Sequence, residues 1–303
     1  MKRLIFNYLV IVALAVLAAF TSCNKEEDPD PVAPFKIEGI THENFPVLDG
    51  STTAGPLIFL IASELLGNNW WTEDLVEQKL KTSQTHNAFI NLIDKKADLI
   101  FSARTMSADE KAHAAEAGVH LIETPIALDA LIFIVNPKNR VKSLKHKQLQ
   151  DIYTGKITNW WEVGGNFAPI TPYVRNRNSG SQELMEALLL TEPISEDFPE
   201  DWIIGGMMIL LSAVQMDVNG LGYTVAYYRT TMFKDFEGVK TLAVNGIYPD
   251  NKTIKNWKYP YTSEFYAIIR SDLDKSSMAF KLYELMQTRA GKRVIADSGY
   301  VPN

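Results

Sequence analysis

The sequence has little cysteine and lacks the common hydrolase and metal motifs. Cys23 is its only cysteine in 303 residues, so internal disulfide bonds and cysteine-based metal sites are excluded. There is no Gly-x-Ser-x-Gly turn and no His-Glu-x-x-His spacing, and the five histidines are scattered. The net charge of −6 argues against nucleic acid as a partner. We therefore expect no metal, no cofactor and no enzymatic activity.

The first 23 residues are typical of a processing segment. Lys2 and Arg3 precede an apolar run at residues 4–20, and small residues stand just before Cys23. This pattern predicts a bacterial lipoprotein signal peptide, with lipid such as palmitate attached to Cys23. The alternative is a membrane-spanning anchor, because the apolar run is near the lower length limit for a span. A lipoprotein also explains the position of the cysteine, so we expect a protein anchored by lipid in the bacterial cell envelope.

Residues 24–40 are expected to form a disordered tether, since residues 24–34 are charged, rich in proline and without apolar periodicity. The acidic cluster behind Cys23 resembles the surface-export signals of some Gram-negative lipoproteins. Its alternative role is simply to keep the linker solvated. The sequence leaves open whether the protein faces the periplasm or the cell exterior.

Residues 173–185 have the pattern of an anion-binding turn. They read Tyr-Val-Arg-Asn-Arg-Asn-Ser-Gly-Ser-Gln-Glu-Leu-Met, which is a strand-like lead-in, a small polar turn and the start of a helix. Ser179, Gly180 and Ser181 would place hydroxyl and backbone N–H groups at the positive end of that helix. Arg175 lies close enough to add a guanidinium, and each hydrogen bond to an anion is worth about 1.5–3 kcal/mol. The alternative is an ordinary serine N-cap beside a surface arginine.

Two further stretches have related patterns. Residues 49–56 form a second hydroxyl-rich turn before an apolar helical pattern, and residues 97–104 read as a buried strand that ends in Ser102 and Arg104. Strand and helix patterns alternate along the chain, and residues 107–110 fit a capping box. This alternation predicts an α/β protein with a parallel sheet and helices on both faces.

With these turns, four other segments make the chain resemble the phosphate-binding proteins of bacterial ABC importers. Residues 126–139 correspond to a strand that crosses between lobes, and residues 149–160 to a helix and turn of the second lobe. Residues 219–223 correspond to the strand before the return crossover, and residues 290–302 to the C-terminal helix and tail. The resemblance extends over nearly everything from Phe45 to the C-terminus.

The resemblance implies a two-lobed periplasmic-binding-protein-like fold of type II. In that fold each lobe is a sheet flanked by helices, and two crossover strands form the hinge. Residues 41–127 and 229–303 would form lobe 1, and residues 128–228 would form lobe 2. The chain would return to lobe 1 near residues 225–228.

The resemblance also implies a function and a site. The protein would bind phosphate or a similar tetrahedral oxyanion between lobes that close on it, and would deliver it to an ABC-importer permease. The implied ligand-binding residues are Ser51, Thr52, Thr53, Thr85 and Ser102 from lobe 1, and Arg175, Ser179, Gly180 and Ser181 from lobe 2. Near Thr85, a shift of one or two residues would select Ser83 or His86 instead. The expected partners are the anion, the permease and, through lipid, the membrane, and the protein would be a monomer.

Two other functions stay open. A sensory or scaffolding lipoprotein would keep the fold without a transport role, and its tryptophan pairs at residues 70–71 and 160–161 would serve as partner surfaces. A phosphate-ester hydrolase is the less favoured alternative.

Two positions depart from the pattern of the family. Its members commonly place an aspartate, which accepts a proton from the ligand, where this sequence has Ala103, and many have an acidic or neutral residue in place of Arg177. We therefore hypothesise looser discrimination between phosphate and sulfate, or a preference for the dianion, unless Asp49 or another acid not apparent in the sequence supplies the acceptor. Asp129, in an otherwise apolar segment, would pair with Arg175 or cap a neighbouring helix.

Overall fold

The structure is a computed structural model that describes residues 33–303, apart from the side chain of Asn69. The predicted signal peptide, Cys23 and the tether up to residue 32 lie outside the described residues. The folded unit begins at Phe35, and Phe35 and Ile37 are buried in its core. Residues 35–40, expected in the tether, therefore belong to the folded unit. No helix within residues 33–303 combines the length and the apolar character needed to cross a membrane.

Eight strands form one mixed sheet. Its path runs through β1 (Leu48–Gly50), β2 (Leu99–Ser102), β11 (Thr262–Arg270), β3 (Leu121–Val135), β8 (Gly220–Val225) and β5 (Thr171–Pro172), while β9 (Lys240–Thr241) and β12 (Val301–Pro302) pair with β3. The outer pairs β1–β2 and β5–β8 are parallel, whereas β11 is antiparallel to β2 and β3, and β3 is antiparallel to β8. The prediction of a parallel sheet is thus wrong for the central strands, which are antiparallel because the chain runs back and forth between the lobes.

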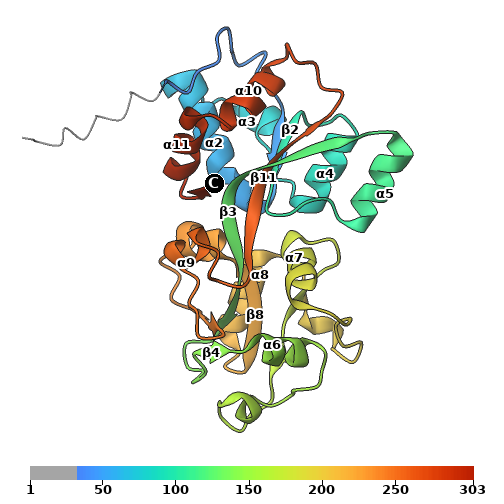
Figure 1. Cartoon of the computed structure of the whole chain (residues 1–303), viewed down its shortest axis with the longest axis vertical. Helices are drawn as coiled ribbons and strands as arrows, with labels where there is room; N and C mark the ends of the chain where they lie inside the picture. Colours follow the sequence, from blue (N-terminus) through green and yellow to red (C-terminus); the bar gives the residue numbers. More distant parts are fainter. Residues whose placement is uncertain (1–32) are drawn as a thin grey trace, which may run out of the picture. The chain divides into compact units, whose positions relative to one another are not determined.

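The long strand β3 joins the two lobes. Its first part pairs with β11 as far as Ala130, opposite Thr262, and its last part pairs with β8 from Leu131, opposite Val225. Figure 1 shows β3 and β11 running side by side between an upper and a lower group of helices. The predicted crossover strand within residues 126–139 is confirmed as part of β3.

Each lobe has its own apolar core, covered by helices. The helices of lobe 1 are α2 (Gly55–Leu66), α3 (Glu73–Lys79), α4 (Thr85–Ile93), α5 (Ala108–Ala117), α10 (Met278–Met286) and α11 (Arg289–Asp297). Those of lobe 2 are α6 (His146–Tyr153), α7 (Gly180–Leu189), α8 (Met207–Met216) and α9 (Asn251–Lys255). Two small sheets complete lobe 2, β4 (Ser143–Leu144) with β10 (Ala243–Val244), and β6 (Val174–Arg175) with β7 (Ile203–Ile204).

The final crossing into lobe 1 comes later than the sequence placed it. Val239, Leu242 and Ile254 are buried in the core of lobe 2, although residues 229–303 were assigned to lobe 1. The reason is strand pairing, since β9 extends the lobe-2 half of β3 and β10 pairs with β4. The chain leaves lobe 2 only at β11.

Local sequence signals explain where two helices of lobe 1 begin. Pro56 lies in the first turn of α2, where a missing N–H group costs nothing, and Leu57 and Ile61 turn inward from it. The predicted capping box is present at α5, where Ser107 and Glu110 each accept a hydrogen bond from the other's backbone N–H group.

Candidate functional site

A cavity of about 180 Å³ lies between the lobes, where several strands end. Its lining comes from both lobes: Ser51, Thr52, Thr53, Gln84, Thr85, His86, Asn87 and Ala103, and Arg175, Asn176, Arg177, Asn178, Ser179, Gly180, Ser181, Met207 and Val225. The structure thus brings together eight of the nine residues predicted as ligands, and Ser102 is the ninth.

The wall on the side of lobe 1 begins with the turn from β1 into α2. A Cβ atom at Gly50 would lie 2.5 Å from the carbonyl oxygen of Phe101, so this close approach requires glycine. The N–H of Ser51 donates to the same oxygen at 3.0 Å, and the hydroxyls of Ser51 and Thr53 are 3.0 Å apart. The turn η1 (Thr52–Ala54) leads directly into α2. Their first N–H groups lack intrahelical acceptors, which favours an anion beside them.

The start of α4 forms the second part of this wall. Gln84 precedes the helix with φ 72° and ψ 160°, a conformation almost restricted to glycine that costs about 1–3 kcal/mol. Thr85 follows and is 5% exposed. Of the two alternatives to Thr85, His86 lines the cavity and Ser83 does not. Such strain next to the predicted ligands is typical of a functional turn.

Asp49 supports this wall from behind. Its Oδ1 accepts hydrogen bonds from the N–H groups of Gly50 (2.7 Å) and Ser83 (2.8 Å), and its Oδ2 accepts one from Nδ2 of Asn91 (2.8 Å). Asp49 is fully buried and is not among the cavity-lining residues. The structure therefore does not place it where it could accept a proton from a ligand.

Arg175 dominates the wall on the side of lobe 2. The residue ends β6 and is 6% exposed. Its Nε donates to the carbonyl oxygen of Ile204 at 2.9 Å, and one Nη lies 3.4 Å from Oγ of Ser181. Burial lowers the pKa of Arg175, and among the described residues no carboxylate offsets it. A buried guanidinium without a carboxylate partner favours an anion in the cavity that it lines.

The start of α7 completes this wall. Oγ of Ser179 accepts a hydrogen bond from the N–H of Gln182 at 3.3 Å and lies 3.3 Å from Oγ of Ser181. Ser179 is thus a helix N-cap, as the alternative proposed, and also lines the cavity. A Cβ atom at Gly180 would lie 2.3 Å from Oγ1 of Thr85, so the two lobes meet here with room only for glycine.

Ser102 does not join the site. Its Oγ donates to the carbonyl oxygen of Arg104 (2.8 Å) and accepts from the N–H of Arg104 (3.2 Å), which closes the turn after β2. Ala103, the next residue, lines the cavity instead.

Asp129 has a structural role. Its Oδ1 accepts hydrogen bonds from the N–H groups of Ala130 (2.8 Å) and Tyr227 (3.0 Å), so that it caps the helical turn η5 (Tyr228–Met232). Burial raises the pKa of Asp129 to about 7 against the opposing effect of these N–H groups. Of the two predicted roles, capping is the one observed, and pairing with Arg175 is wrong.

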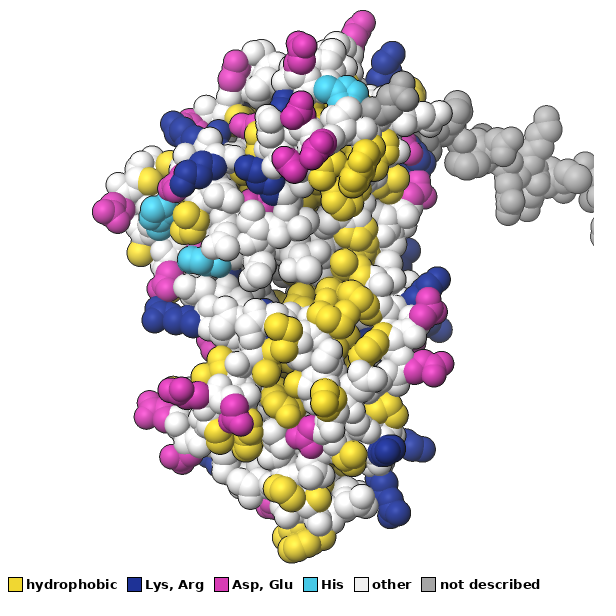
Figure 2. Space-filling view, turned by 180° about the vertical axis from the view of Figure 1, so that it is seen from behind, with side chains coloured by type: hydrophobic (Ala, Val, Ile, Leu, Met, Phe, Trp, Pro, Cys, Tyr) yellow, Lys and Arg dark blue, Asp and Glu magenta, His cyan; other side chains and the backbone are white. Residues whose placement is uncertain are grey.

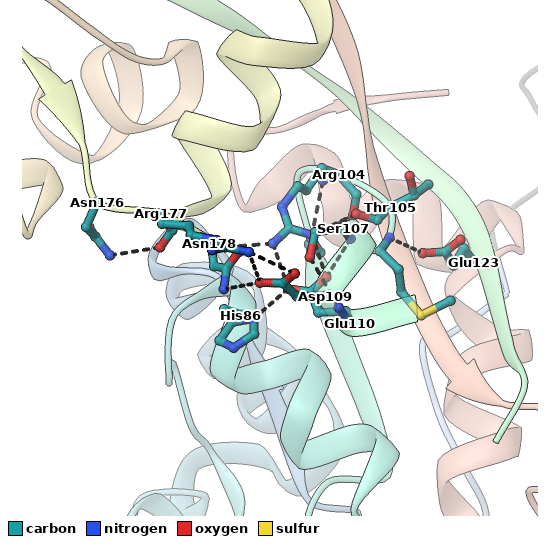
Figure 3. A network of polar contacts seen from close by, with 12 residues as sticks. His86, Arg104, Thr105, Ser107, Asp109, Glu110, Glu123, Asn176, Arg177 and Asn178 are labelled. Carbon is teal, nitrogen blue, oxygen red and sulfur yellow. Dashed lines mark hydrogen bonds and ion pairs between the residues drawn. The ribbon is translucent and has the colours of Figure 1, made fainter. Parts of the chain in front are cut away.

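Two arginines near the cavity, Arg104 after β2 and Arg177 before α7, are each neutralised by an acidic residue of α5. Arg104 binds Glu110 through two hydrogen bonds of 2.7 and 2.8 Å, and both residues are buried (Figure 3). Arg177 lies at the rim, 81% exposed, with its Nη2 2.9 and 3.1 Å from the two carboxylate oxygens of Asp109. The extra positive charge expected from Arg177 is therefore balanced by an ion pair.

That ion pair joins the lobes, because Asp109 belongs to lobe 1 and Arg177 to lobe 2. Nδ2 of Asn178 also donates to Asp109, at 3.1 Å (Figure 3). Asn178 has φ 63°, a left-handed conformation that asparagine tolerates better than most residues. Together these contacts form a latch, defined here as Asp109, Arg177 and Asn178.

The cavity lining contains no aspartate or glutamate. The lining residues that sequence reasoning missed include four amides within two residues of predicted positions: Gln84, Asn87, Asn176 and Asn178. Met207 and Val225 were also missed, and they lie far along the sequence from any predicted position. Figure 2 shows acidic and basic side chains interspersed over one face of the protein. On that face, selection for an anion therefore depends on local donors rather than on a surface charge of one sign.

Comparisons with known proteins agree with this geometry. A family model of the PBP superfamily domain matches residues 76–288. The chain is 24% identical to phosphate-binding protein PstS of Borreliella burgdorferi over 268 residues. This match spans 86% of this chain and 90% of the relative. A structure of a phosphate ABC transporter substrate-binding protein from Clostridium perfringens, with bound phosphate, is 24% identical and covers 85% of this chain and 99% of its own, with a TM-score of 0.63. An ABC-type phosphate transport receptor from Vibrio cholerae is 21% identical, with the same two coverages and a TM-score of 0.61. These structural likenesses confirm the predicted two-lobed α/β fold.

Proposed function

The chain belongs to the PBP superfamily, and we propose that it binds phosphate or a similar tetrahedral oxyanion between its lobes and delivers it to the permease of an ABC importer. The names of its relatives support phosphate as the first candidate. We propose a binding protein and not an enzyme, attached by lipid at Cys23 to a membrane of the bacterial cell envelope.

The observation that carries this proposal is the state of Arg175. Its guanidinium is buried, lines the cavity and has no carboxylate partner among the described residues. Isolated buried charges are costly, and an anion in the cavity would balance this one. The charge-assisted hydrogen bonds involved are each worth about 1.5–3 kcal/mol.

The remaining donors fit a small anion that is held from two sides. Ser51, Thr52 and Thr85 offer hydroxyls at the starts of α2 and α4, and Ser179 and Ser181 offer hydroxyls at the start of α7. A tetrahedral oxyanion has enough oxygens to accept hydrogen bonds from both lobes at once. Long organic anions are disfavoured by the cavity volume of about 180 Å³.

Capture would proceed by lobe closure. One lobe binds the anion first, and the second lobe then adds its own donors, so the anion stabilises the closed arrangement. The approach of Gly180 to Thr85 and the latch at Asp109 are contacts of that arrangement. A permease that recognises both lobes together would then distinguish loaded from unloaded protein.

Two measurements test the proposal. Native mass spectrometry of the purified protein should detect a retained small anion, and calorimetric titration with phosphate should give one bound anion per chain. Absence of phosphate and sulfate binding in calorimetry would refute the proposed site. For the transport role, the protein should co-purify with an importer permease from detergent-solubilised membranes, whereas binding of phosphate without such a partner favours a sensory role.

A further inference from the structure

Basic side chains gather at one edge of lobe 2, away from the anion cavity. Residues 136–150 contain five lysine or arginine residues and no aspartate or glutamate, in a chain whose net charge is −6. Of the five, Lys147 is paired with Asp151 at 2.7 Å. The other four are exposed and form no ion pair within residues 33–303, and we call them the basic ridge: Lys138, Arg140, Lys142 and Lys145. Figure 1 places β4, which this segment enters, at the lower left of lobe 2, and the reverse view in Figure 2 shows basic side chains gathered at the lower right.

The first three bases of the ridge lie on one side of the chain. Lys138, Arg140 and Lys142 are exposed, whereas Asn139 and Val141 between them are buried. Such alternation is that of an extended chain, in which residues two apart lie on the same side, about 6.6 Å from each other. The three charges therefore form a row.

Buried groups beneath the row hold its backbone in place. Val141 belongs to the core of lobe 2, and its N–H donates to Oδ1 of Asn139 at 2.9 Å. The carbonyl oxygen of Asn139 accepts a hydrogen bond from Nζ of Lys240 in β9. Asn136 donates to a carbonyl oxygen of α8 at 2.6 Å and accepts from the N–H of Lys138 at 2.9 Å. The backbone that carries the bases is thus preorganised, which lowers the entropic cost of binding.

Like charges crowd one another in this part of the surface. Burial lowers the pKa of Lys240, and the positive charge of Lys142 lowers it further, so the two ammonium groups are close enough to repel. No acidic side chain of the described residues pairs with the ridge to offset this repulsion. A ligand that carries several negative charges would relieve it.

We propose that the basic ridge binds a linear anionic polysaccharide that carries sulfate or phosphate groups, an interaction separate from the anion cavity. A row of charges suits an extended polyanion better than a single small anion, and arginine can bind a sulfate or phosphate group through two parallel hydrogen bonds.

Two features of the segment favour a polysaccharide over other polyanions. Residues 136–150 contain no phenylalanine, tyrosine or tryptophan, so the ridge lacks the stacking platforms on which single-stranded nucleic acids depend. Its valine and leucine side chains, Val141, Leu144 and Leu149, are all buried, so none can insert into a lipid surface.

The test is calorimetric titration of heparin, a sulfated polysaccharide, at low salt. The wild type should bind heparin, and added NaCl should weaken this binding. In the variant with Lys138→Gln, Arg140→Gln and Lys142→Gln, heparin affinity should fall by about tenfold or more. Phosphate affinity of this variant should stay at the wild-type value, because none of the three residues lines the cavity.

A matched control removes the same charge from lobe 2 at three exposed lysines in and after α9: Lys252→Gln, Lys255→Gln and Lys258→Gln. Its heparin affinity should stay within about threefold of the wild type, since these lysines lie outside the ridge. An equal loss in both variants would mean that heparin responds only to net charge, and this overturns the ridge as a site.

The other outcomes are also decisive. Absence of heparin binding by the wild type overturns the proposal, and it does so whether or not phosphate binds in the cavity. Tighter binding to single-stranded DNA or to phosphatidylglycerol vesicles than to heparin overturns the choice of a polysaccharide. A measurement on the wild type alone needs no folded variant: heparin should protect Lys138 and Lys142 from acetylation while Lys252 and Lys255 stay reactive, and equal reactivity of all four with heparin present refutes the site.

Discussion

Replacing Arg175 with alanine should abolish tight anion binding while leaving the fold intact. The side chain is buried and lines the cavity, and its fork can offer two charge-assisted hydrogen bonds to an anion. At about 1.5–3 kcal/mol each, their loss corresponds to roughly 3–6 kcal/mol, or about a 10²- to 10⁴-fold rise in Kd.

The effect on the ligand-free protein should be much smaller. Truncation removes the hydrogen bond from Nε to the carbonyl oxygen of Ile204, which costs about 1 kcal/mol, and three longer contacts of the Nη atoms, 3.4–3.5 Å from Ser181, Asn176 and Gly205. It also removes a guanidinium whose burial is itself unfavourable, as the lowered pKa of Arg175 indicates. These two effects oppose each other, so the free energy of unfolding without anion should change little.

Thermal melting with and without phosphate measures both quantities, and calorimetry gives Kd. At a phosphate concentration of about 1,000 times the wild-type Kd, binding should stabilise the wild type by about 4 kcal/mol. If Kd rises about 1,000-fold in Arg175→Ala, the same concentration should stabilise the variant by only about 0.4 kcal/mol. Arg175→Lys, which keeps the charge and loses the fork, should fall between the two.

Arg140→Ala is the matched control, since Arg140 is an exposed arginine of lobe 2 that does not line the cavity. It should bind as the wild type. The reasoning fails if Arg175→Ala binds phosphate within about threefold of the wild type, because a buried ligand to the anion cannot be removed at so low a cost.

Three further predictions concern closure and pH. Gly180→Ala places a Cβ atom 2.3 Å from Oγ1 of Thr85, so the lobes should no longer close fully; phosphate affinity should fall at least about tenfold with little change in melting temperature, and unchanged affinity would contradict the contact. Asp109→Asn removes the ion pair with Arg177, which is exposed, so affinity should fall by only about 0.2–1 kcal/mol, and less in high salt; a large, salt-independent loss in calorimetry would show that the latch does more than this. Burial raises the folded-state pKa of Asp129 to about 7, above that of the unfolded chain, so the folded state holds more protons between about pH 4 and 7 and its stability should fall as pH rises through this window. Denaturant unfolding of the wild type and Asp129→Asn at both ends of the window checks this, and equal pH slopes for the two proteins would be contrary to it.

Most of the candidate site could be predicted from local sequence, because its parts are local. Arg175 and Ser179 lie within one strand, turn and helix start, and hydroxyls at residues 51–53 follow a strand directly. In such turns the backbone itself directs donors to one point. The amides that were missed, such as Asn87, are neighbours of predicted residues and carry no pattern of their own.

Ser102 was misplaced for a physical reason that sequence does not reveal. Both Ser102 and Ala103 are at the end of β2, and which of them faces the cavity depends on the turn that follows. The hydroxyl of Ser102 closes that turn onto Arg104, which leaves the small side chain of Ala103 at the cavity. A choice made by one hydrogen bond has no periodic signature.

The fold was predictable in class but not in the course of its crossovers. Alternating strands and helices predicted the α/β class, yet the antiparallel centre arises from β3 and β11, which are far apart in sequence. Val239 and Leu242 read equally well as core residues of either lobe, and only the pairing of β9 with β3 decides between them. The ion pair between Asp109 and Arg177 is likewise a contact between distant segments that no local pattern encodes.

In the proposed function, capture of the anion and closure of the lobes are coupled through the same groups. In this arrangement Gly180 lies against Thr85 and Arg175 is only 6% exposed. The proposed closure would therefore remove the guanidinium from water. Without an anion that step is unfavourable, because hydroxyls do not balance a buried charge. With an anion, the same step adds a second set of donors to the ligand, so the anion must bind the closed arrangement more tightly than the open one. The exposed pair of Asp109 and Arg177 adds about 0.2–1 kcal/mol to closure whether or not ligand is present, which is too little to close the lobes alone. Closure therefore follows occupancy of the cavity, and a permease that binds both lobes would receive loaded protein in preference to unloaded protein.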